Sequence, residues 1–384
     1  MSAPPDPQPL YLDHAATSPP RREVLEAVWP YLTRVTANPS SAHAAGREAR
    51  EALEQAREVV AGVLGARPGE VVFTGGGTEA DNLAVTGIAR AAPRGRHVVV
   101  SAVEHPAVLE TALALRAEGF RVDVVGVDGD GVLDLEALRR TVTGGTTLVS
   151  VMYANNEVGT VQPLAEVAEV CRDRGVPLHT DAVQAAGSLP LDVDALGVDA
   201  LSASAHKFGG LRGAGFLHVR GALALEPVLH GGGQERGRRS GTVDVASAVG
   251  TAVALHLAEA AREEESRRLA GLRDRLVAGV LAAVPGARLT GHPVRRLPHH
   301  ASFCFPGVGG ETVLAELEAL GVTCSSGSAC AAGSEDASHV LLACGLDADT
   351  ARTAVRLTLG RTTTEEDVER VVDLVPRAVG LARA

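Results

Sequence analysis

Short runs of apolar residues recur between residues 70 and 220. Seven of these runs have the length of a buried strand, at 71–74, 97–101, 122–127, 147–152, 176–180, 198–202 and 215–219. Stretches with helical spacing separate most of the first six. In residues 78–91, for example, Leu83, Gly87 and Ile88 share one helical face. This alternation predicts an α/β fold in which a mostly parallel sheet of seven strands is covered by helices on both faces.

The pattern changes near residue 245. Residues 245–284 form mostly one long helical stretch, and its charged run at 262–265 is typical of a solvated face. The remaining expected elements are strands near 299–305 and 354–359, and helices near 310–320, 336–344 and 364–382. This looser order predicts a smaller α+β domain. We therefore expect a large domain over 18–255 and a small C-terminal domain over 256–384, joined by the N-terminal segment 1–17.

The N-terminal part has a less regular pattern. Residues 11–18 predict a short strand that runs into a turn, and residues 38–43 predict a loop before a helix that reaches about Leu64. Residues 1–9 are polar and proline-rich, which is unlike a signal peptide or a transit peptide.

Composition then narrows the class of protein. Hydrophobic residues make up 45% of the chain and charged residues 22%, as in soluble globular proteins. A net charge of −11 argues against a nucleic-acid surface and against binding to anionic membranes. No apolar run approaches the roughly 20 residues of a membrane span. The 5 cysteines include no C-x-x-C pair, which favours a reducing cytoplasm over a disulfide framework and indicates no metal site.

Polar residues follow several of the expected strands at the edge where ligands bind in α/β proteins. Glu104 and His105 follow the second strand, Asn155–Glu157 the fourth, and Asp181 and Gln184 the fifth. Asp181 suits two roles, capping the next helix or holding a proton on a cationic ring. After the first strand, residues 75–78 read Gly-Gly-Gly-Thr, a turn that lets backbone N–H groups bind a phosphate.

Lys207 follows the sixth expected strand and is the only lysine among the 36 Lys and Arg residues of the chain. The other 35 of these basic residues are arginine. A lysine differs from arginine because it can lose its proton when buried and then attack a carbonyl group. Lys207 is therefore the candidate Schiff-base residue, and chance retention of one lysine is the alternative.

Nine segments of the chain together resemble, in order, the motifs of cysteine desulfurases of the NifS/IscS type. These are pyridoxal-phosphate (PLP) enzymes of the class V aminotransferase group. The segments span nearly the whole chain and are 11–17, 38–43, 74–82, 104–109, 155–159, 181–184, 202–207, 239–242 and 325–330. The resemblance implies the fold-type I architecture of PLP-dependent transferases and a homodimer.

The resemblance also implies roles around the cofactor ring. Lys207 would bind PLP covalently, and Asp181 would pair with the ring nitrogen and keep it protonated. Gln184 would hydrogen-bond the ring hydroxyl. His105 would stack on the ring and shuttle protons, and Asn156 would lie beside the ring.

Further roles concern the phosphate and the substrate. The residues expected to hold the phosphate are Gly77, Thr78, Ser204 and His206, together with Thr242 from the neighbouring subunit. Arg356 would bind the substrate carboxylate as a bidentate fork. Asn38 and Asn156 are further candidates on the substrate side.

Cys330 lies in the stretch 324–334, which consists mostly of glycine, serine and alanine. Without large side chains to anchor it, this stretch is expected to be a mobile loop. The resemblance implies that Cys330 is the catalytic nucleophile, which attacks the sulfur of bound cysteine and then carries it to an acceptor. A free thiol on a loop is the alternative interpretation.

The sequence thus predicts a cytoplasmic cysteine desulfurase that converts L-cysteine to L-alanine and leaves sulfur as a persulfide on Cys330. The acceptor would be an iron–sulfur scaffold protein or a tRNA-thiolating enzyme. A selenocysteine lyase or another class V enzyme is the first alternative. A catalytically idle sulfur carrier is the second, and the joint presence of Lys207, Asp181 and His105 argues against it.

Overall fold

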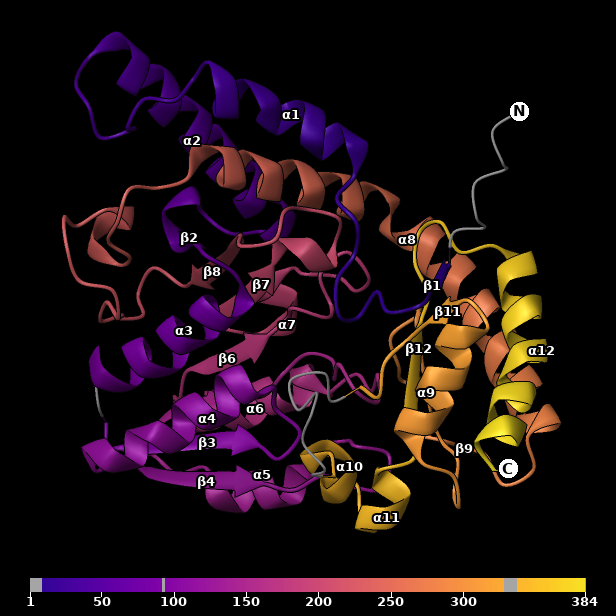
Figure 1. Cartoon of the computed structure of the whole chain (residues 1–384). Coiled ribbons are helices and arrows are strands. Elements are labelled where there is room, and N and C mark those ends of the chain that lie inside the picture. The colour runs from indigo at the N-terminus through magenta and orange to yellow at the C-terminus, as the bar shows by residue number, and fades with distance from the viewer. Residues whose placement is uncertain (1–8, 92–93, 328–336, 384) are drawn as a thin grey trace, which may run out of the picture.

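A seven-stranded sheet forms the centre of the large part of the molecule (Figure 1). The computed structural model describes residues 9–91, 94–327 and 337–383. The strand order is β2-β8-β7-β6-β5-β3-β4, and only β8 runs against its neighbours. The strands are β2 (Val71–Thr74), β3 (His97–Ser101), β4 (Arg121–Val125), β5 (Thr146–Ser150), β6 (Leu178–Asp181), β7 (Ala200–Ser204) and β8 (Gly215–Val219). The predicted α/β fold with a mostly parallel sheet is confirmed.

Alternating side chains bury both faces of this sheet. In β2, Val71 and Phe73 join one core cluster and Val72 joins another, as the twofold repeat of a strand requires. The first face is covered by α1 (Arg22–Thr33), α2 (Ala44–Leu64), α5 (Leu135–Thr141), α6 (Leu164–Arg174), α7 (Val193–Leu196) and the first half of α8 (Val245–Ala283). The second face is covered by α3 (Gly77–Ala91) and α4 (Pro106–Ala114). Because both faces are covered, every strand except the edge strand β4 is buried along its whole length, which explains the largely apolar runs in the sequence.

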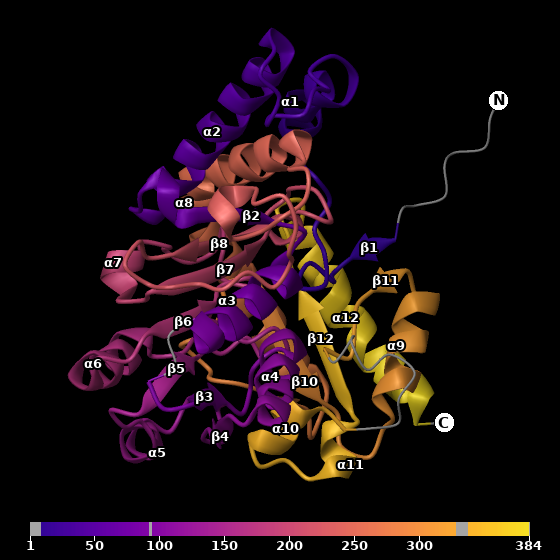
Figure 2. The same cartoon turned by 90° about the vertical axis from the view of Figure 1, so that its left-hand side faces the viewer.

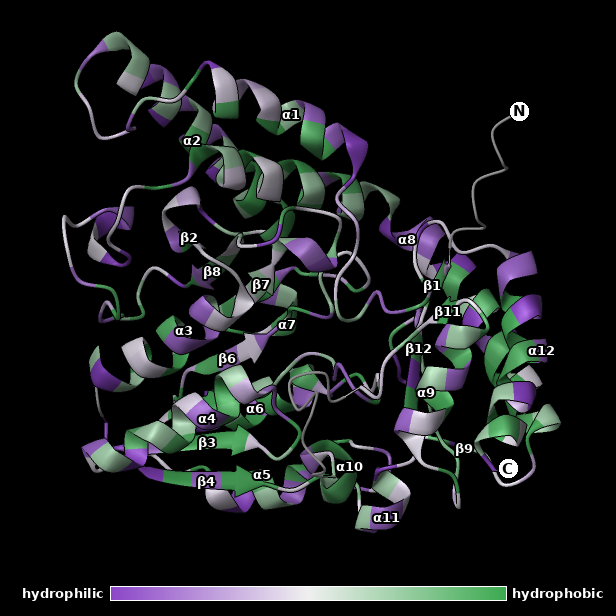
Figure 3. Cartoon of the chain, in the orientation of Figure 1, coloured by the Kyte–Doolittle hydropathy of each residue, from purple (hydrophilic) through white to green (hydrophobic). Residues whose placement is uncertain are grey.

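A smaller α+β unit follows along the chain (Figure 2). Its antiparallel sheet has the order β12-β10-β9, and the N-terminal β1 pairs with β11. These strands are β1 (Leu10–Tyr11), β9 (Arg288–Leu289), β10 (His300–Cys304), β11 (Val322–Thr323) and β12 (Ala354–Thr358). Its helices are α9 (Gly310–Ala319), α10 (His339–Ala343), α11 (Ala348–Ala351) and α12 (Glu365–Ala382). Figure 3 shows hydrophobic and hydrophilic stripes along α12, whose valines pack into this second core.

The long helix α8 connects the two cores. Its residues as far as Ala258 pack with the large sheet, and those from Leu269 onward pack with the small sheet. The packing partner therefore changes between these two residues, whereas the expected division at 255/256 stays a prediction. Among the described residues, no helix combines the length and the apolar character needed to cross a bilayer.

The sequence pattern missed α1. Only Val24 and Val28 of this helix are buried, and Pro30 lies within it. Leu25, Trp29 and Leu32 share a helical face with these two valines but are exposed, and a proline inside a helical pattern usually ends the helix, so the stretch does not read as one helix in the sequence. The pattern also missed the two-residue strands β9 and β11, which are too short to show a repeat.

Candidate active site

One cavity gathers most of the side chains that the sequence singled out. It has a volume of about 440 Å³. The parallel strands β2, β3, β5, β6 and β7 end beside it, so the residues that follow them meet at one edge of the sheet. The predicted site residues that line the cavity are Gly77, Thr78, His105, Asn156, Asp181, Gln184, Ser204, His206, Lys207 and Arg356.

Lys207 reaches the cavity from a single 3-10 turn, Ala205–Lys207, directly after β7. Its Nζ donates hydrogen bonds to the carbonyl oxygens of Ala15 and Ala16, the second at 2.9 Å. The Gln184 side-chain amide donates to the Ala15 carbonyl as well, at 2.9 Å. The N-terminal segment thus fixes both side chains at the wall of the cavity.

Asp181, which is buried, and His105, which is half-buried, line the cavity together. Asp181 ends β6, and one of its carboxylate oxygens accepts the Val183 backbone N–H at 2.8 Å. Burial raises the pKa of Asp181, and nearby His105 and Lys207 act against this effect. Burial lowers the pKa of His105, whose Nδ1 accepts the Ala107 backbone N–H at 3.1 Å and caps α4. A cationic group bound beside Asp181 would favour its ionised form.

At the far side of the cavity, α3 begins with Gly77, so its first backbone N–H groups have no partner within the helix. A Cβ at Gly77 would lie 2.7 Å from Val183 Cγ2 and 3.3 Å from Ser204 Cβ. Glycine therefore allows the helix to begin this close to the ends of β6 and β7. The His206 Nδ1 lies 3.1 Å from the Thr17 Oγ1 beside this helix start. A helix N-terminus with hydroxyl and imidazole groups around it is a typical phosphate environment.

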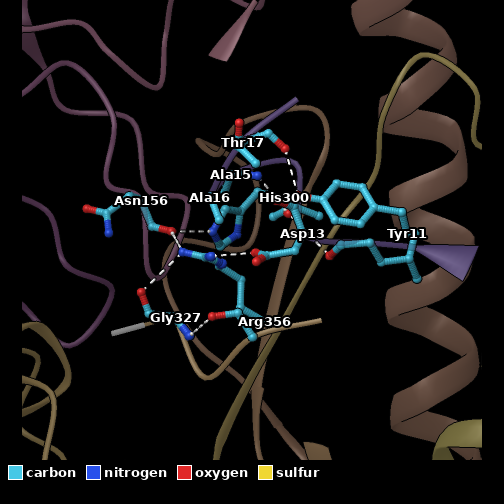
Figure 4. Close-up of polar contacts among 12 residues, drawn as sticks. Tyr11, Asp13, Ala15, Ala16, Thr17, Asn156, His300, Gly327 and Arg356 are labelled. Carbon is cyan, nitrogen blue, oxygen red and sulfur yellow. Dashed lines mark hydrogen bonds and ion pairs between the residues drawn. The ribbon is translucent and has the colours of Figure 1, made fainter. Parts of the chain in front are cut away.

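Arg356 projects from β12 into the cavity wall and is almost fully buried (Figure 4). Its Nη1 donates to the backbone carbonyls of Asn156 and Gly327, at 2.9 and 3.1 Å. Its Nη2 forms an ion pair with Asp13 at 2.7 Å. The Nε–H has no hydrogen-bond partner in the described part of the chain. A buried N–H of this kind is available to a carboxylate ligand.

Several further polar residues of the cavity were not given roles from the sequence. Asp81, Glu157 and His339 line it, and Glu104 lies behind them with one oxygen accepting the Met152 backbone N–H at 2.7 Å. Burial raises the pKa of both Asp81 and Glu104 well above the ordinary range. Asp81 lies one helical turn after Gly77, which was a usable signal, whereas nothing in the sequence pattern placed His339 at the site.

Two of the predicted site residues, Thr242 and Asn38, do not line this cavity. Thr242 is exposed and lines a separate hollow beside Phe73 and Arg239. Asn38 is exposed, and its side chain accepts the Ser40 backbone N–H at 2.8 Å. Cys330 and the rest of 328–336 lie outside the described residues, so the predicted nucleophile and most of its loop have no structural account.

The four cysteines that the structure describes are free thiols and form no disulfide with one another. Cys171, Cys304 and Cys344 are buried, and Cys324 is partly buried. Burial raises the pKa of Cys171, Cys324 and Cys344 to about 12 in each case, which keeps these sulfurs protonated near neutral pH. Within the described residues, no group of His, Cys, Asp and Glu side chains has an arrangement suited to a metal ion.

The cavity fits pyridoxal phosphate. Its volume is within the range of small-molecule sites. An amine, a buried carboxyl group and the glycine-started N-terminus of α3 line the same space, which matches the aldehyde, the ring nitrogen and the phosphate of that cofactor.

Comparison with known proteins places the chain in a family. Residues 10–371 match the family described as Aminotransferase class-V, and the chain belongs to that family. Within it, the chain belongs to the cysteine desulfurases of the NifS/IscS type, because its full-length relatives carry those names.

Three relatives illustrate the similarity. The IscS-like cysteine desulfurase of Mycobacterium tuberculosis is 49% identical over 381 residues, which cover 97% of each chain. The cysteine desulfurase IscS of Methanosarcina thermophila is 44% identical, over 96% of this chain and 92% of the relative. A solved structure titled NifS-like protein has a TM-score of 0.91 and 37% identity, over 97% of this chain and 100% of that one.

Proposed function

We propose that this protein is a cysteine desulfurase that uses pyridoxal phosphate to convert L-cysteine to L-alanine, with the sulfur retained as a persulfide on Cys330. The observation that carries the proposal is the meeting of Lys207, Asp181 and Arg356 in one cavity. An amine, a buried carboxyl group and a carboxylate-binding cation are the minimum set for amino-acid chemistry with this cofactor.

The chain's own residues would hold the cofactor as follows. Gly77, Thr78, Ser204 and His206 would bind its phosphate at the start of α3, and Lys207 would bind its aldehyde carbon. Asp181 would accept the hydrogen bond of the protonated ring nitrogen, which in turn keeps Asp181 ionised despite its burial. When bound, pyridoxal phosphate supplies an electron-withdrawing ring that stabilises negative charge on the substrate carbons.

Arg356 would orient the substrate. The Asp13 carboxylate and two backbone carbonyls fix the guanidinium, and its Nε–H remains for the carboxylate of L-cysteine. A fixed guanidinium loses little conformational freedom on binding, so it defines the position of the substrate relative to Lys207.

Sulfur transfer requires a thiol of the enzyme. When the thiolate of Cys330 attacks the substrate sulfur, an S–S bond forms and the C–S bond breaks, with its electron pair left on the substrate carbon. The sulfur is oxidised as the carbon is reduced, so no external oxidant takes part. Protonation of that carbon yields the methyl group of alanine.

The protein's partners follow from the same proposal. We propose a homodimer, in which the exposed Thr242 completes the phosphate site of the second subunit. The persulfide would pass to an acceptor protein, either an iron–sulfur scaffold or a tRNA-thiolating enzyme. The cytoplasmic location indicated by the cysteine content stays a prediction.

Product analysis tests the proposal. The purified protein, loaded with pyridoxal phosphate and supplied with L-cysteine and a reductant, should release alanine and sulfide in equal amounts. The Lys207→Ala variant should release neither above background, because it removes the amine that binds the cofactor. A product that has lost the amino group would instead indicate an aminotransferase. Alanine from selenocysteine but not from cysteine would indicate a selenocysteine lyase.

A further inference from the structure

His339 lines the cavity but has no role in the proposed function. It is the first residue of α10 and lines the cavity together with His105 and Glu157. Its Nε2 lies 3.0 Å from the backbone carbonyl oxygen of Glu104. A carbonyl oxygen can only accept, so Nε2 must carry a proton. In the neutral ring the lone pair is therefore on Nδ1, which makes no hydrogen bond within the described part of the chain.

The other two imidazoles of the cavity are arranged differently. His105 uses the lone pair of its Nδ1 to accept the Ala107 N–H, so its neutral ring offers an N–H at Nε2. His206 has its Nδ1 within 3.1 Å of the Thr17 hydroxyl, and burial lowers its pKa to about 4. Of the three, His339 is the ring that combines a fixed N–H with a basic nitrogen not used by a neighbouring group.

The reaction needs such a basic nitrogen. The attacking enzyme thiol must lose its proton before its sulfur can bond to the substrate sulfur. The persulfide product keeps the proton of the substrate thiol, and the carbon that becomes the methyl group of alanine gains one proton. One proton therefore moves, in net terms, from the enzyme thiol to that carbon. A group that accepts this proton during the attack on the bound substrate would line the cavity.

We propose that His339 is a catalytic base in sulfur transfer and takes the proton of the attacking thiol on Nδ1. The inference rests on the proposed desulfurase activity and adds a residue to it. As the proton moves to Nδ1, the S–S bond forms and the C–S bond breaks. The imidazolium then holds the proton that alanine formation consumes, so the step balances without a further reactant. The Glu104 carbonyl keeps the ring in the required tautomer throughout.

Both acidic and basic groups surround His339. Ser338 donates a hydrogen bond to Glu157 at 2.5 Å, which brings a carboxylate next to the segment that carries His339. The ionisable groups on the surrounding elements are His105 and Glu104 before α4, Glu157 after β5, Asp128 and Asp130 after β4, and Asp347 and Asp349 at α11. All of these but His105 are carboxyl groups, and the same cavity is also lined by Asp181 and by the cations Lys207 and Arg356.

Two substitutions separate a base from a merely structural residue. In His339→Gln, the side-chain amide keeps an N–H for the Glu104 carbonyl but has no basic nitrogen. His339→Ala removes both. General bases contribute roughly 10²–10⁴-fold to rate, so both variants should form alanine at least about 100-fold more slowly than wild type in single-turnover experiments. Added imidazole should restore activity to His339→Ala, because it can enter the vacated space and supply the missing nitrogen.

Cofactor absorbance and thermal unfolding should match wild type in both variants, and the exposed helix residue His256→Gln serves as the matched control. A His339→Gln enzyme with wild-type rates would show that only the N–H matters, and would overturn the proposal. Slow variants that imidazole does not rescue would overturn it too. If the wild-type enzyme itself forms no alanine, the proposed function fails first, which distinguishes the two outcomes.

Discussion

At the scale of single residues, Arg356 shows how the fold prepares a cation for a ligand. Its neighbours come from segments far apart in the sequence, with Asp13 from the N-terminal segment and Asn156 from the loop after β5 (Figure 4). A buried guanidinium with an ion pair is held in one orientation, since breaking such a pair is costly. The Nε–H, which has no hydrogen-bond partner among the described residues, then has a fixed direction in which the proposed carboxylate would bind.

Arg356→Lys tests this role. The charge is kept, but a lysine cannot bond both carbonyls, Asp13 and a substrate carboxylate with the same geometry. Loss of one charge-assisted hydrogen bond costs roughly 1.5–3 kcal/mol, so the Michaelis constant for L-cysteine should rise by about 10- to 100-fold. Steady-state kinetics of alanine release measure the change.

The matched control is Arg361→Lys, five residues further on at an exposed position. That substitution should leave the Michaelis constant near the wild-type value. An unchanged Michaelis constant in Arg356→Lys would mean that the substrate carboxylate binds elsewhere.

At the scale of elements, much of the site could be predicted because it follows from strand ends. Asp181 and Lys207 each follow an apolar run, and parallel strands bring such positions to one edge of a sheet. The glycine turn before α3 could be predicted as well, because it directly follows the apolar run of β2. Its Gly77 lets α3 begin close to the ends of β6 and β7. Local pattern and parallel topology are sufficient for this part of the site.

Contacts between distant segments could not be predicted in this way. The pairing of Asp13 with Arg356 joins residues 343 positions apart, and the Glu104 carbonyl meets His339 across 235 positions. No short-range pattern encodes either contact. The helix α1 was missed for a different reason, because Pro30 lies within it and a proline usually ends a helical pattern.

At the scale of the whole molecule, one chain does not account for every predicted site residue. Thr242 is exposed and lines a hollow separate from the cavity, so the proposed role at a cofactor phosphate requires a second subunit. The apolar side chains of Leu25, Trp29 and Leu32 on α1 are 48%, 65% and 58% exposed, and their spacing places them on one helical face. Apolar surface of this kind favours association with another protein surface.

Dilution of the holoenzyme tests whether association completes the site. We expect a dimer that retains pyridoxal phosphate at high concentration and releases it as it dissociates. Thr242→Ala should lose the cofactor more readily at every concentration, because it removes one hydroxyl from the phosphate site. Sedimentation monitored at the absorbance of the cofactor measures both. A monomer fully loaded with cofactor would contradict the shared site.

The central claim is that Cys330 receives the sulfur of L-cysteine, and mass spectrometry after one turnover tests it most directly. Holoenzyme mixed with an equimolar amount of L-cysteine, alkylated and digested, should carry one extra sulfur atom on the peptide that contains Cys330, with one alanine released per site. Cys171, Cys324 and Cys344 should remain unmodified, because burial keeps their thiols protonated. Cys330→Ser should retain the cofactor and form no alanine. Extra sulfur on another cysteine, or alanine release by Cys330→Ser at the wild-type rate, would contradict the account.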